Sequence, residues 1–429
     1  MIWGENNAGQ LGDSSLINAD TAEQVAGLNG ITAVGAGASH TLALKSDGTI
    51  MAWGRNLNGQ LGDSTNTDRA YPVRVKNLNS VVKIFAQGNK SLALKNDSSV
   101  WIWGSNAFGQ LGIGSPLASI NYPIRVDTLS KIIDITAGNS HSLALNADGT
   151  VWAWGLNQHG GIGDGSMTNR TKPVKTLYIT GITKVAAGGF HSLALKNDGT
   201  VWTWGMNWQG EIGDGTLIDK VSPTQVYGLN SVVAIAGGID HSIALKNDGT
   251  VWTWGFNSNG QLGNGSYYTT GCRCDSFAYQ VPGLSGIIGI AAGGDHSLAL
   301  KNDGTLWAWG LNIYGELGLG YFSGGACHCV ETPTQVIDLC TVLGVEDMKG
   351  AGNNVSVYTN PAQTEITVDF NFMEKVNTIE IKNVLGQTIK ELKAKDSKMD
   401  IDVSALQSGI YFIIVKNSKE SISRKFIKE

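Results

Sequence analysis

The segment His191-Ser-Leu-Ala-Leu-Lys-Asn-Asp-Gly-Thr-Val-Trp-Thr-Trp-Gly205 decides the fold, because it recurs nearly letter for letter from His241 to Gly255. Looser copies begin at His40, His141 and His296, and a copy at Lys90 lacks the histidine. Trp-Gly pairs occur 50 to 55 residues apart, at Trp3, Trp53, Trp103, Trp154, Trp204, Trp254 and Trp309. The chain therefore repeats a unit of about 50 residues.

Each unit has the pattern of four short strands. In the fifth unit, residues 232–236 and 242–245 are runs typical of strands, and residues 251–254 return with side chains on alternate faces. Between them, Asn247-Asp-Gly-Thr250 supplies a hairpin turn in which Gly249 permits a positive φ. Four strands per unit of about 50 residues predict an all-β fold, a seven-bladed β-propeller.

The first blade is expected to be incomplete at the N-terminus. Seven Trp-Gly strands are accompanied by only six strands of the His-Ser-Leu-Ala-Leu type, and Met1-Ile-Trp-Gly4 begins inside a unit. We therefore expect that the start is truncated or was assigned wrongly. Thr341-Val-Leu-Gly-Val345 keeps the register of a first strand and could supply part of the missing partner.

The composition changes after Cys340. Residues 1–340 hold all 13 Trp and 52 of the 57 Gly, and their 19 basic and 24 acidic residues account for the net charge of −5. Residues 341–429 have 12 basic and 12 acidic residues. We expect a propeller over 1–340, a linker over 341–354 and a second domain over 355–429. Its short alternating runs predict a small antiparallel β-sandwich.

Several classes of function lack their sequence signals. No run of 18 apolar residues could span a membrane, and the balanced charge offers no basic face for nucleic acid. Phosphate-binding loops, Gly-x-Ser-x-Gly elbows and His-Glu-x-x-His are absent. We therefore expect no cofactor and no enzymatic activity.

The repeats resemble the regulator-of-chromosome-condensation repeat family over about 80% of the chain. The shared pattern runs from Gly-x-x-His-Ser-Leu-Ala-Leu through Asp-Gly-x-Val-x-x-Trp-Gly to Asn-x-x-Gly-Gln-Leu-Gly, as in Asn56 to Gly62. The resemblance implies a seven-bladed propeller. It also implies two kinds of activity: founding eukaryotic members exchange nucleotide on a small GTPase, and secreted bacterial relatives bind an enzyme and inhibit it.

Residues 355–429 resemble the type IX secretion system C-terminal sorting domain of Bacteroidetes. The matching segments are Val355-Ser-Val-Tyr-Thr-Asn-Pro361, Ile381-Lys-Asn-Val-Leu-Gly-Gln387, Ile401-Asp-Val-Ser-Ala-Leu406, Gly409-Ile-Tyr-Phe412 and Lys425-Phe-Ile-Lys428. Thr359 departs from the family, which usually has Pro there. The resemblance implies the type IX secretion machinery as a partner, and a secreted or outer-membrane surface-attached protein. Such cargo also needs an export signal, which this sequence does not show.

Most of the chemically suggestive residues are repeated, which favours structural roles. Five histidines occupy one repeat position and are expected to form hydrogen bonds that pack the blades. Twelve of the 13 Trp lie in Trp-x-Trp-Gly strands and are expected to form the core between blades. Asp13, Asp63, Asp164 and Asp214 are expected to cap turns.

Three aromatic residues lie outside this pattern and are the candidate binding residues. Trp208 follows Gly205 in a loop, and Phe108 and Tyr314 occupy the corresponding loops of other units. Aromatic side chains are over-represented at the centres of interfaces. His159 is interpreted as an ordinary loop residue.

Four cysteines mark two unusual loops. Cys272-Arg-Cys274 and Cys327-His-Cys329 lie at equal offsets after Trp254 and Trp309, in units with five extra residues. Disulfides are the first interpretation for a secreted chain, and strain in a Cys-x-Cys ring favours bonds between the loops. Free thiols and a zinc site made by the four thiols with His328 are the alternatives. Cys340 is left over.

These observations predict an exported binding module. The propeller presents loops to an unknown extracellular protein or glycan, and the C-terminal domain directs export. A guanine-nucleotide exchange factor-like regulator and a polysaccharide-active enzyme are the alternatives.

Overall fold

The computed structural model describes most of the chain. The described residues are 1–115, 117–267, 274–324, 327–336, 356–358, 363–369, 378–383, 388–394, 397–406, 409–416 and 421–428. Every regular element among them is a β-strand. The chain divides into two compact units, Met1–Ile337 and Asp338–Glu429.

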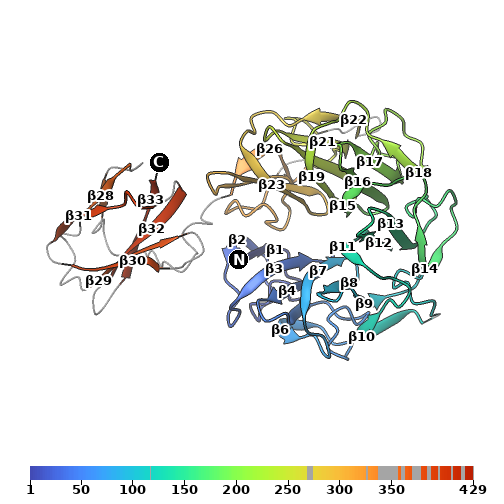
Figure 1. Ribbon diagram of the computed structural model, residues 1–429, viewed down its shortest axis with the longest axis horizontal. Helices are drawn as coiled ribbons and strands as arrows, with labels where there is room; N and C mark the ends of the chain where they lie inside the picture. Colours follow the sequence, from blue (N-terminus) through green and yellow to red (C-terminus); the bar gives the residue numbers. More distant parts are fainter. Residues whose placement is uncertain are drawn as a thin grey trace. The chain divides into compact units, whose positions relative to one another are not determined.

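The first unit is a ring of antiparallel sheets, with six four-stranded blades and a described pair, β1 (Ile2–Gly4) with β2 (Ala19–Glu23) (Figure 1). The first three blades are β3 (Ile31–Ala36), β4 (His40–Lys45), β5 (Ile50–Gly54), β6 (Arg69–Arg74); β7 (Val81–Gln87), β8 (Lys90–Lys95), β9 (Val100–Ser105), β10 (Ser119–Arg125); and β11 (Ile132–Ala137), β12 (His141–Asn146), β13 (Val151–Gly155), β14 (Arg170–Lys175). The next three are β15 (Ile182–Ala187), β16 (His191–Lys196), β17 (Val201–Gly205), β18 (Lys220–Gln225); β19 (Val232–Gly237), β20 (His241–Lys246), β21 (Val251–Phe256), β22 (Cys274–Gln280); and β23 (Ile287–Ala292), β24 (His296–Lys301), β25 (Leu306–Leu311), β26 (Cys329–Gln335). The predicted β-propeller is confirmed.

A short turn sets the register of the central hairpin in each blade. β20 pairs with β21 from His241 opposite Gly255 to Leu245 opposite Val251. In the turn between them, Oδ1 of Asp248 accepts hydrogen bonds from the backbone nitrogen and the hydroxyl of Thr250, at 3.0 and 2.6 Å. Gly249 has a φ of 79°, which glycine adopts at little cost. The sequence Asp-Gly-Thr therefore fixes the turn locally.

One tryptophan per blade joins neighbouring blades. Nε1 of Trp254 donates to the carbonyl of Glu211 in the preceding unit at 2.8 Å, and the ring is fully buried. The same bond is made by Trp53, Trp103, Trp154, Trp204 and Trp309. Nε1 of Trp3 makes it with the carbonyl of Glu316 at 2.8 Å, so the N-terminal strand packs against the last blade. These bonds close the ring of seven blades.

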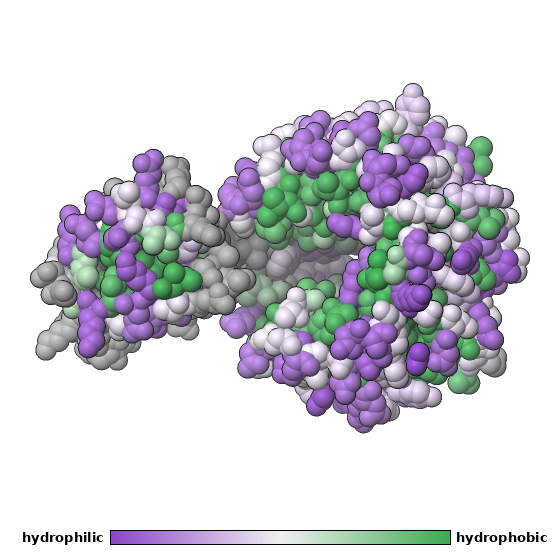
Figure 2. All heavy atoms as spheres, in the orientation of Figure 1, coloured by the Kyte–Doolittle hydropathy of each residue, from purple (hydrophilic) through white to green (hydrophobic). Residues whose placement is uncertain are grey.

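The paired tryptophans share one hydrophobic core. Trp252 is half-buried and packs against the cluster that contains Trp254, Leu195 and Val201. Four other pairs pack in the same way. The predicted core between the blades is therefore confirmed. Figure 2 shows one face of the ring, where hydrophobic residues gather around the central opening and hydrophilic residues predominate at the outer edge.

The second unit contains two sheets that enclose one core. One consists of β27 (Ser356–Tyr358), β28 (Glu365–Asp369) and β31 (Lys398–Asp402). The other consists of β30 (Thr388–Lys393), β29 (Thr378–Asn383), β32 (Gly409–Lys416) and β33 (Ser421–Lys428). Ile366 and Ile401 from the first sheet and Ile379 and Ile413 from the second are buried in one cluster. Two sheets around a shared apolar layer form the predicted sandwich.

Two further expectations concern the missing strand with its linker and membrane-spanning segments. Thr341–Val345 lies outside the described residues, as does the whole of the expected linker, 341–354. No helix long and apolar enough to cross a membrane occurs in the parts of the chain that the structure describes.

Candidate functional site

The repeated histidines hold the blades together. Nε2 of His191 lies 3.0 Å from Oγ of Ser242 in the next blade, and that hydroxyl donates to the carbonyl of Glu211 at 3.1 Å. Nε2 must therefore carry the proton, which leaves Nδ1 of His191 without a partner. Burial lowers the pKa of His191 to about 3. His40, His141 and His241 make the same contact, so the predicted packing role is confirmed for four of the five repeat histidines.

Lys90 takes the histidine position in one blade. The side chain is fully buried, and Nζ donates to the carbonyls of Gly138 and Asn139, the second at 3.1 Å. Burial lowers the pKa of Lys90 to about 7. Lys90 thus joins two blades as the histidines do, but with a group that is far more costly to bury when charged.

The cysteine loops differ from the prediction. Cys327 is bonded to Cys329 within one loop, where we expected a bond between loops. His328 between them has a φ of 51°, which turns the chain back and brings the two Cα atoms to 5.1 Å. Cys274 is also disulfide-bonded, and Cys272 and Cys340 lie outside the described residues.

The sulfurs of Cys327 and Cys329 also lie near a carboxylate of Glu331. These ligand atoms fall within 4.8 Å of one another and form the one such group of three among the described residues. With both sulfurs in a disulfide, no thiolate is available to bind zinc. The predicted alternative of a site with four thiols and His328 is not the arrangement found here, since Nδ1 of His328 contacts the carbonyl of Ser323 at 3.1 Å.

A cluster centred on His159 spans two blades and includes the exposed Trp208. The side chain of Trp208 is 60% exposed, whereas the other tryptophans are buried or half-buried. The ring of His159 meets it edge to face, with centroids 4.9 Å apart, and meets Phe190 at 6.0 Å. Nδ1 of His159 lies 2.8 Å from Oδ2 of Asp219, which fixes the imidazole against Trp208. We call His159, Phe190, Trp208 and Asp219 the seam cluster.

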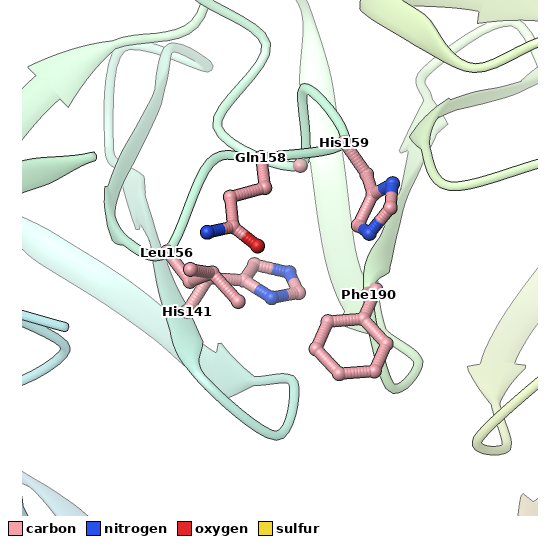
Figure 3. Close-up of a pocket in the computed structure, with 6 residues that line it drawn as sticks. His141, Leu156, Gln158, His159 and Phe190 are labelled. Atoms are coloured by element: carbon pink, nitrogen blue, oxygen red, sulfur yellow. The ribbon is translucent and has the colours of Figure 1, made fainter. Parts of the chain in front are cut away.

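A small hollow adjoins the seam cluster. His141, Leu156, Gln158, His159, Gly161 and Phe190 line it. In Figure 3, the side chains of Gln158, His159 and Phe190 surround this hollow beside the ring of His141. It has room for about one water molecule and lies beside the exposed aromatic surface of the seam cluster.

The three predicted aromatic residues do not form one site. Phe108 is 42% exposed and Tyr314 39% exposed, each in the loop after the Trp-Gly pair of its own blade. No ring contact among the described residues joins either of them to Trp208. All three loops follow third strands and so lie at the same end of the ring.

Sequence reasoning missed three members of the seam cluster, His159, Phe190 and Asp219. His159 was interpreted as an ordinary loop residue, but Asp219 and Trp208 hold it in place. Phe190 precedes a repeat histidine, at a position where the other units have Ser, Asn or Asp. That departure from the repeat was a visible signal. The contact itself was not visible, because it forms between residues of different blades.

Buried carboxyl groups continue the site beyond the seam cluster. Burial raises the pKa of Glu211 to about 8, and the charges of Asp240 and Asp219 add to this. Burial and then the charge of Asp295 raise the pKa of Asp240 to about 6. Burial also raises the pKa of Asp295 and of Glu316. This end of the ring is therefore asymmetric, with aromatic groups beside acidic ones.

Comparisons with known families cover nearly the whole chain. The model of the RCC1-like domain matches residues 1–274. Two models of the regulator of chromosome condensation (RCC1) repeat match residues 287–316 and 303–356. The model of the secretion system C-terminal sorting domain matches residues 356–429.

Solved structures and curated proteins agree with these matches. Prp20p of Saccharomyces cerevisiae, described with its binding to Gsp1p and histones, is 26% identical over 79% of this chain and 86% of that chain, with a TM-score of 0.69. Human WBSCR16 is 22% identical over 78% of this chain and 93% of that chain, with a TM-score of 0.68, which shows the fold alone. The human E3 ubiquitin-protein ligase HERC2 is 44% identical over 43 residues, which are 10% of this chain and 1% of the ligase.

Proposed function

The chain belongs to the RCC1-like domain family and carries a secretion-system sorting domain, and from this premise we propose that its propeller is an extracellular binding module whose ligand contacts the seam cluster. The sorting domain supports a place outside the cell or on its surface, with the type IX secretion machinery as the partner that exports the chain. Phe108 and Tyr314 extend the proposed surface along the same end of the ring.

The exposure of Trp208 is the observation that carries the proposal. A large indole left 60% exposed, while every other tryptophan is at least half-buried, is costly unless something covers it. His159 meets it edge to face and Asp219 holds His159, so the ring is positioned before any ligand arrives. Rigid aromatic anchors lose little entropy on binding, which suits them to recognition.

A protein ligand is favoured over a glycan at this site. Glycans stack on the flat faces of aromatic rings, but one flank of Trp208 is occupied by the edge-to-face contact with His159. The acidic groups beyond the hollow beside Phe190 suit a protruding side chain with polar or charged neighbours. A glycan ligand is retained as an outcome of the test.

Binding should be measured with the full chain against a glycan array and a displayed library of random peptides. Trp208→Ala should weaken the selected ligands by about 10-fold or more, the size expected for a central aromatic anchor. Tyr178→Ala is the matched control, because Tyr178 is 86% exposed in the turn between β14 and β15, at the other end of the blades.

The outcomes separate the possibilities. Selected peptides that lose affinity only in Trp208→Ala support the proposal, and glycans that do so replace the protein ligand with a glycan. Ligands that bind wild type and Trp208→Ala equally would place the binding surface elsewhere. If neither collection yields a ligand, the binding function itself fails.

A further inference from the structure

A glutamine side chain bridges neighbouring loops at two places among the described residues. Oε1 of Gln261 accepts from the backbone nitrogen of Asn259 at 3.0 Å, and Nε2 donates to Oδ1 of Asp295 at 3.2 Å. Gln60 makes the same two contacts, with the nitrogen of Asn58 at 2.9 Å and with Oδ1 of Asn89 at 3.4 Å. The side-chain amide of each glutamine thus donates a hydrogen bond to the residue just before the repeat-histidine position of the next blade, which is Asn89 or Asp295.

Glu211 breaks this arrangement. Its Oε2 still accepts from the backbone nitrogen of Gln209 at 2.9 Å, so the side chain keeps the orientation of Gln261. Its Oε1 has no hydrogen-bond partner, although the side chain is 0% exposed. Asp240 is the counterpart of Asp295 in the repeat, and its charge acts on Glu211. Two carboxyl groups therefore stand at the positions where Gln60 and Gln261 pair an amide with its acceptor.

The surroundings of this pair are also acidic. The charge of Asp219 acts on Glu211, the charge of Asp295 on Asp240, and the charges of Glu5 and Asp295 on Glu316. We call Glu211, Asp240, Asp295 and Glu316 the acidic arc. None of its members belongs to an ion pair of the described residues, and no lysine or arginine is among the causes that shift the pKa of any of them. His159 is held by Asp219, so it does not neutralise the arc.

We propose that the acidic arc binds an arginine-rich segment of a protein partner, with one guanidinium group supplying the missing donors between Glu211 and Asp240. This inference rests on the proposed function only in placing the ligand at the same end of the ring. A guanidinium group carries five donors in a fixed plane, and it can therefore serve both carboxylates at once.

The spacing of the arc favours an extended cation over a metal ion. A metal site needs three or more ligand atoms around one point, and within the described part of the chain no three ligand atoms that include a member of the arc lie within 4.8 Å of one another. The arc instead runs across three consecutive blades, from Glu211 through Asp240 and Asp295 to Glu316. A peptide with successive arginines could contact the partly exposed Asp240 and Asp295 as it crosses them.

Binding at this pair is coupled to a proton. Glu211 without a ligand holds its proton near neutral pH, because burial and Asp240 disfavour the charged form. A guanidinium group beside it favours the carboxylate, so binding releases that proton. Affinity should therefore rise with pH while Glu211 titrates, by up to about 10-fold per pH unit for one proton. Arginine stays charged throughout this range, so the ligand contributes no titration of its own.

Isothermal titration calorimetry of the full chain with an octa-arginine peptide at pH 7, 8 and 9 tests the proposal. Glu211→Gln restores the residue found in Gln60, Gln110 and Gln261, so it should fold normally. We expect the affinity of wild type to rise about 10-fold between pH 7 and 9, and Glu211→Gln to abolish that rise. Asp240→Asn should weaken binding at pH 8 by about fivefold or more.

Asp248→Asn is the matched control. Asp248 lies in the turn after β20, while Asp240 immediately precedes that strand, so they occupy opposite ends of one blade about 20 Å apart. Equal affinities of wild type and Glu211→Gln at all three pH values would overturn the proposal, as would an equal loss in Asp248→Asn. Saturable binding of Ca²⁺ alone, lost in Asp240→Asn, would replace the peptide with a metal ion. Trp208→Ala should leave octa-arginine binding intact, so a failure here does not decide the function proposed for the seam cluster.

Discussion

Replacing Lys90 with histidine should stabilise the propeller. Lys90 occupies the position held by a histidine in five other units, and it is fully buried with Nζ on the carbonyls of Gly138 and Asn139. A histidine there would face Ser142, the counterpart of the serines that bond to His40 and His141. Lys90→His therefore restores the contact of the other blades and removes an ammonium group from the interior.

The magnitude follows from the pKa of Lys90. Burial lowers this pKa from 10.5 in a free lysine to about 7 in the folded chain. The unfolded chain therefore binds more protons than the folded chain between pH 7 and 10.5, and the free energy of unfolding rises with pH in that window. At about 1.4 kcal/mol per pKa unit, the buried lysine costs about 4 kcal/mol at pH 7.5 and about 1 kcal/mol at pH 10.

Urea denaturation of the full chain, followed by tryptophan fluorescence, measures the difference. Lys90→His should be more stable than wild type by about 4 kcal/mol at pH 7.5, and the advantage should shrink to about 1 kcal/mol at pH 10. Lys90→Met, which also removes the charge, should show the same convergence. An advantage that does not change with pH, or a less stable Lys90→His at pH 7.5, would refute the reasoning.

Three further predictions test the scaffold and the cysteine loop. The propeller should unfold near pH 5, because burial lowers the pKa of four histidines to about 3, namely His40, His141, His191 and His241. At pH 5 each stays neutral in the folded chain but binds a proton in the unfolded chain, which costs about 2 kcal/mol of stability per histidine. An unfolding midpoint below pH 3.5, measured by circular dichroism across a pH titration, would contradict this. Gly205→Ala should lower the free energy of unfolding by more than about 2 kcal/mol, since φ is 107° and the new Cβ would lie 2.5 Å from the carbonyl oxygen of Phe190. Gly228→Ala is the control in the same urea titration and should cost about 1 kcal/mol, because φ is 70° and no atom lies within 4 Å of the new Cβ. The double variant Cys327→Ser and Cys329→Ser should lower the free energy of unfolding by less than about 2 kcal/mol, because a disulfide between residues only two positions apart restrains the unfolded chain little. A loss near 4 kcal/mol would instead indicate a bond between distant loops.

Most of the fold could be predicted because the sequence repeats its own rules. The Asp-Gly-Thr turn, the alternating Trp-x-Trp strand and the histidine that begins the second strand recur in most units, so each local inference was supported by its copies. The hydrogen bond from Trp254 to the carbonyl of Glu211 recurs at the equivalent positions of the other four-stranded blades, with 43 to 48 residues between donor and acceptor. The ring closure between Trp3 and Glu316 extends that rule to the ends of the repeat array.

The cysteine pairing and the site could not be predicted in the same way. Strain in a Cys-x-Cys ring favoured bonds between the loops, but Cys327 pairs with Cys329 around His328 in a left-handed conformation, and that backbone angle is invisible in the residue letters. The contact of His159 with Trp208 forms across a seam between blades, where the distance depends on how the blades are inclined. Glu211 was one of two acidic residues at a glutamine position, and its unpaired oxygen emerged only with its neighbours in place.

The departures from the repeat explain how a ring of similar blades can carry one site. A seam is the contact between two neighbouring blades. If the seven units were identical, each seam would offer the same surface of low affinity, and a ligand would prefer no position on the ring. Three consecutive seams differ instead, with Gly161 beside Phe190, Glu211 beside Asp240, and Gln261 beside Asp295. The first exposes aromatic surface, the second lacks a hydrogen-bond donor, and the third adds a carboxylate. Because these seams are neighbours, one ligand can contact all of them, so their contributions to affinity combine at a single place while the other seams remain scaffold.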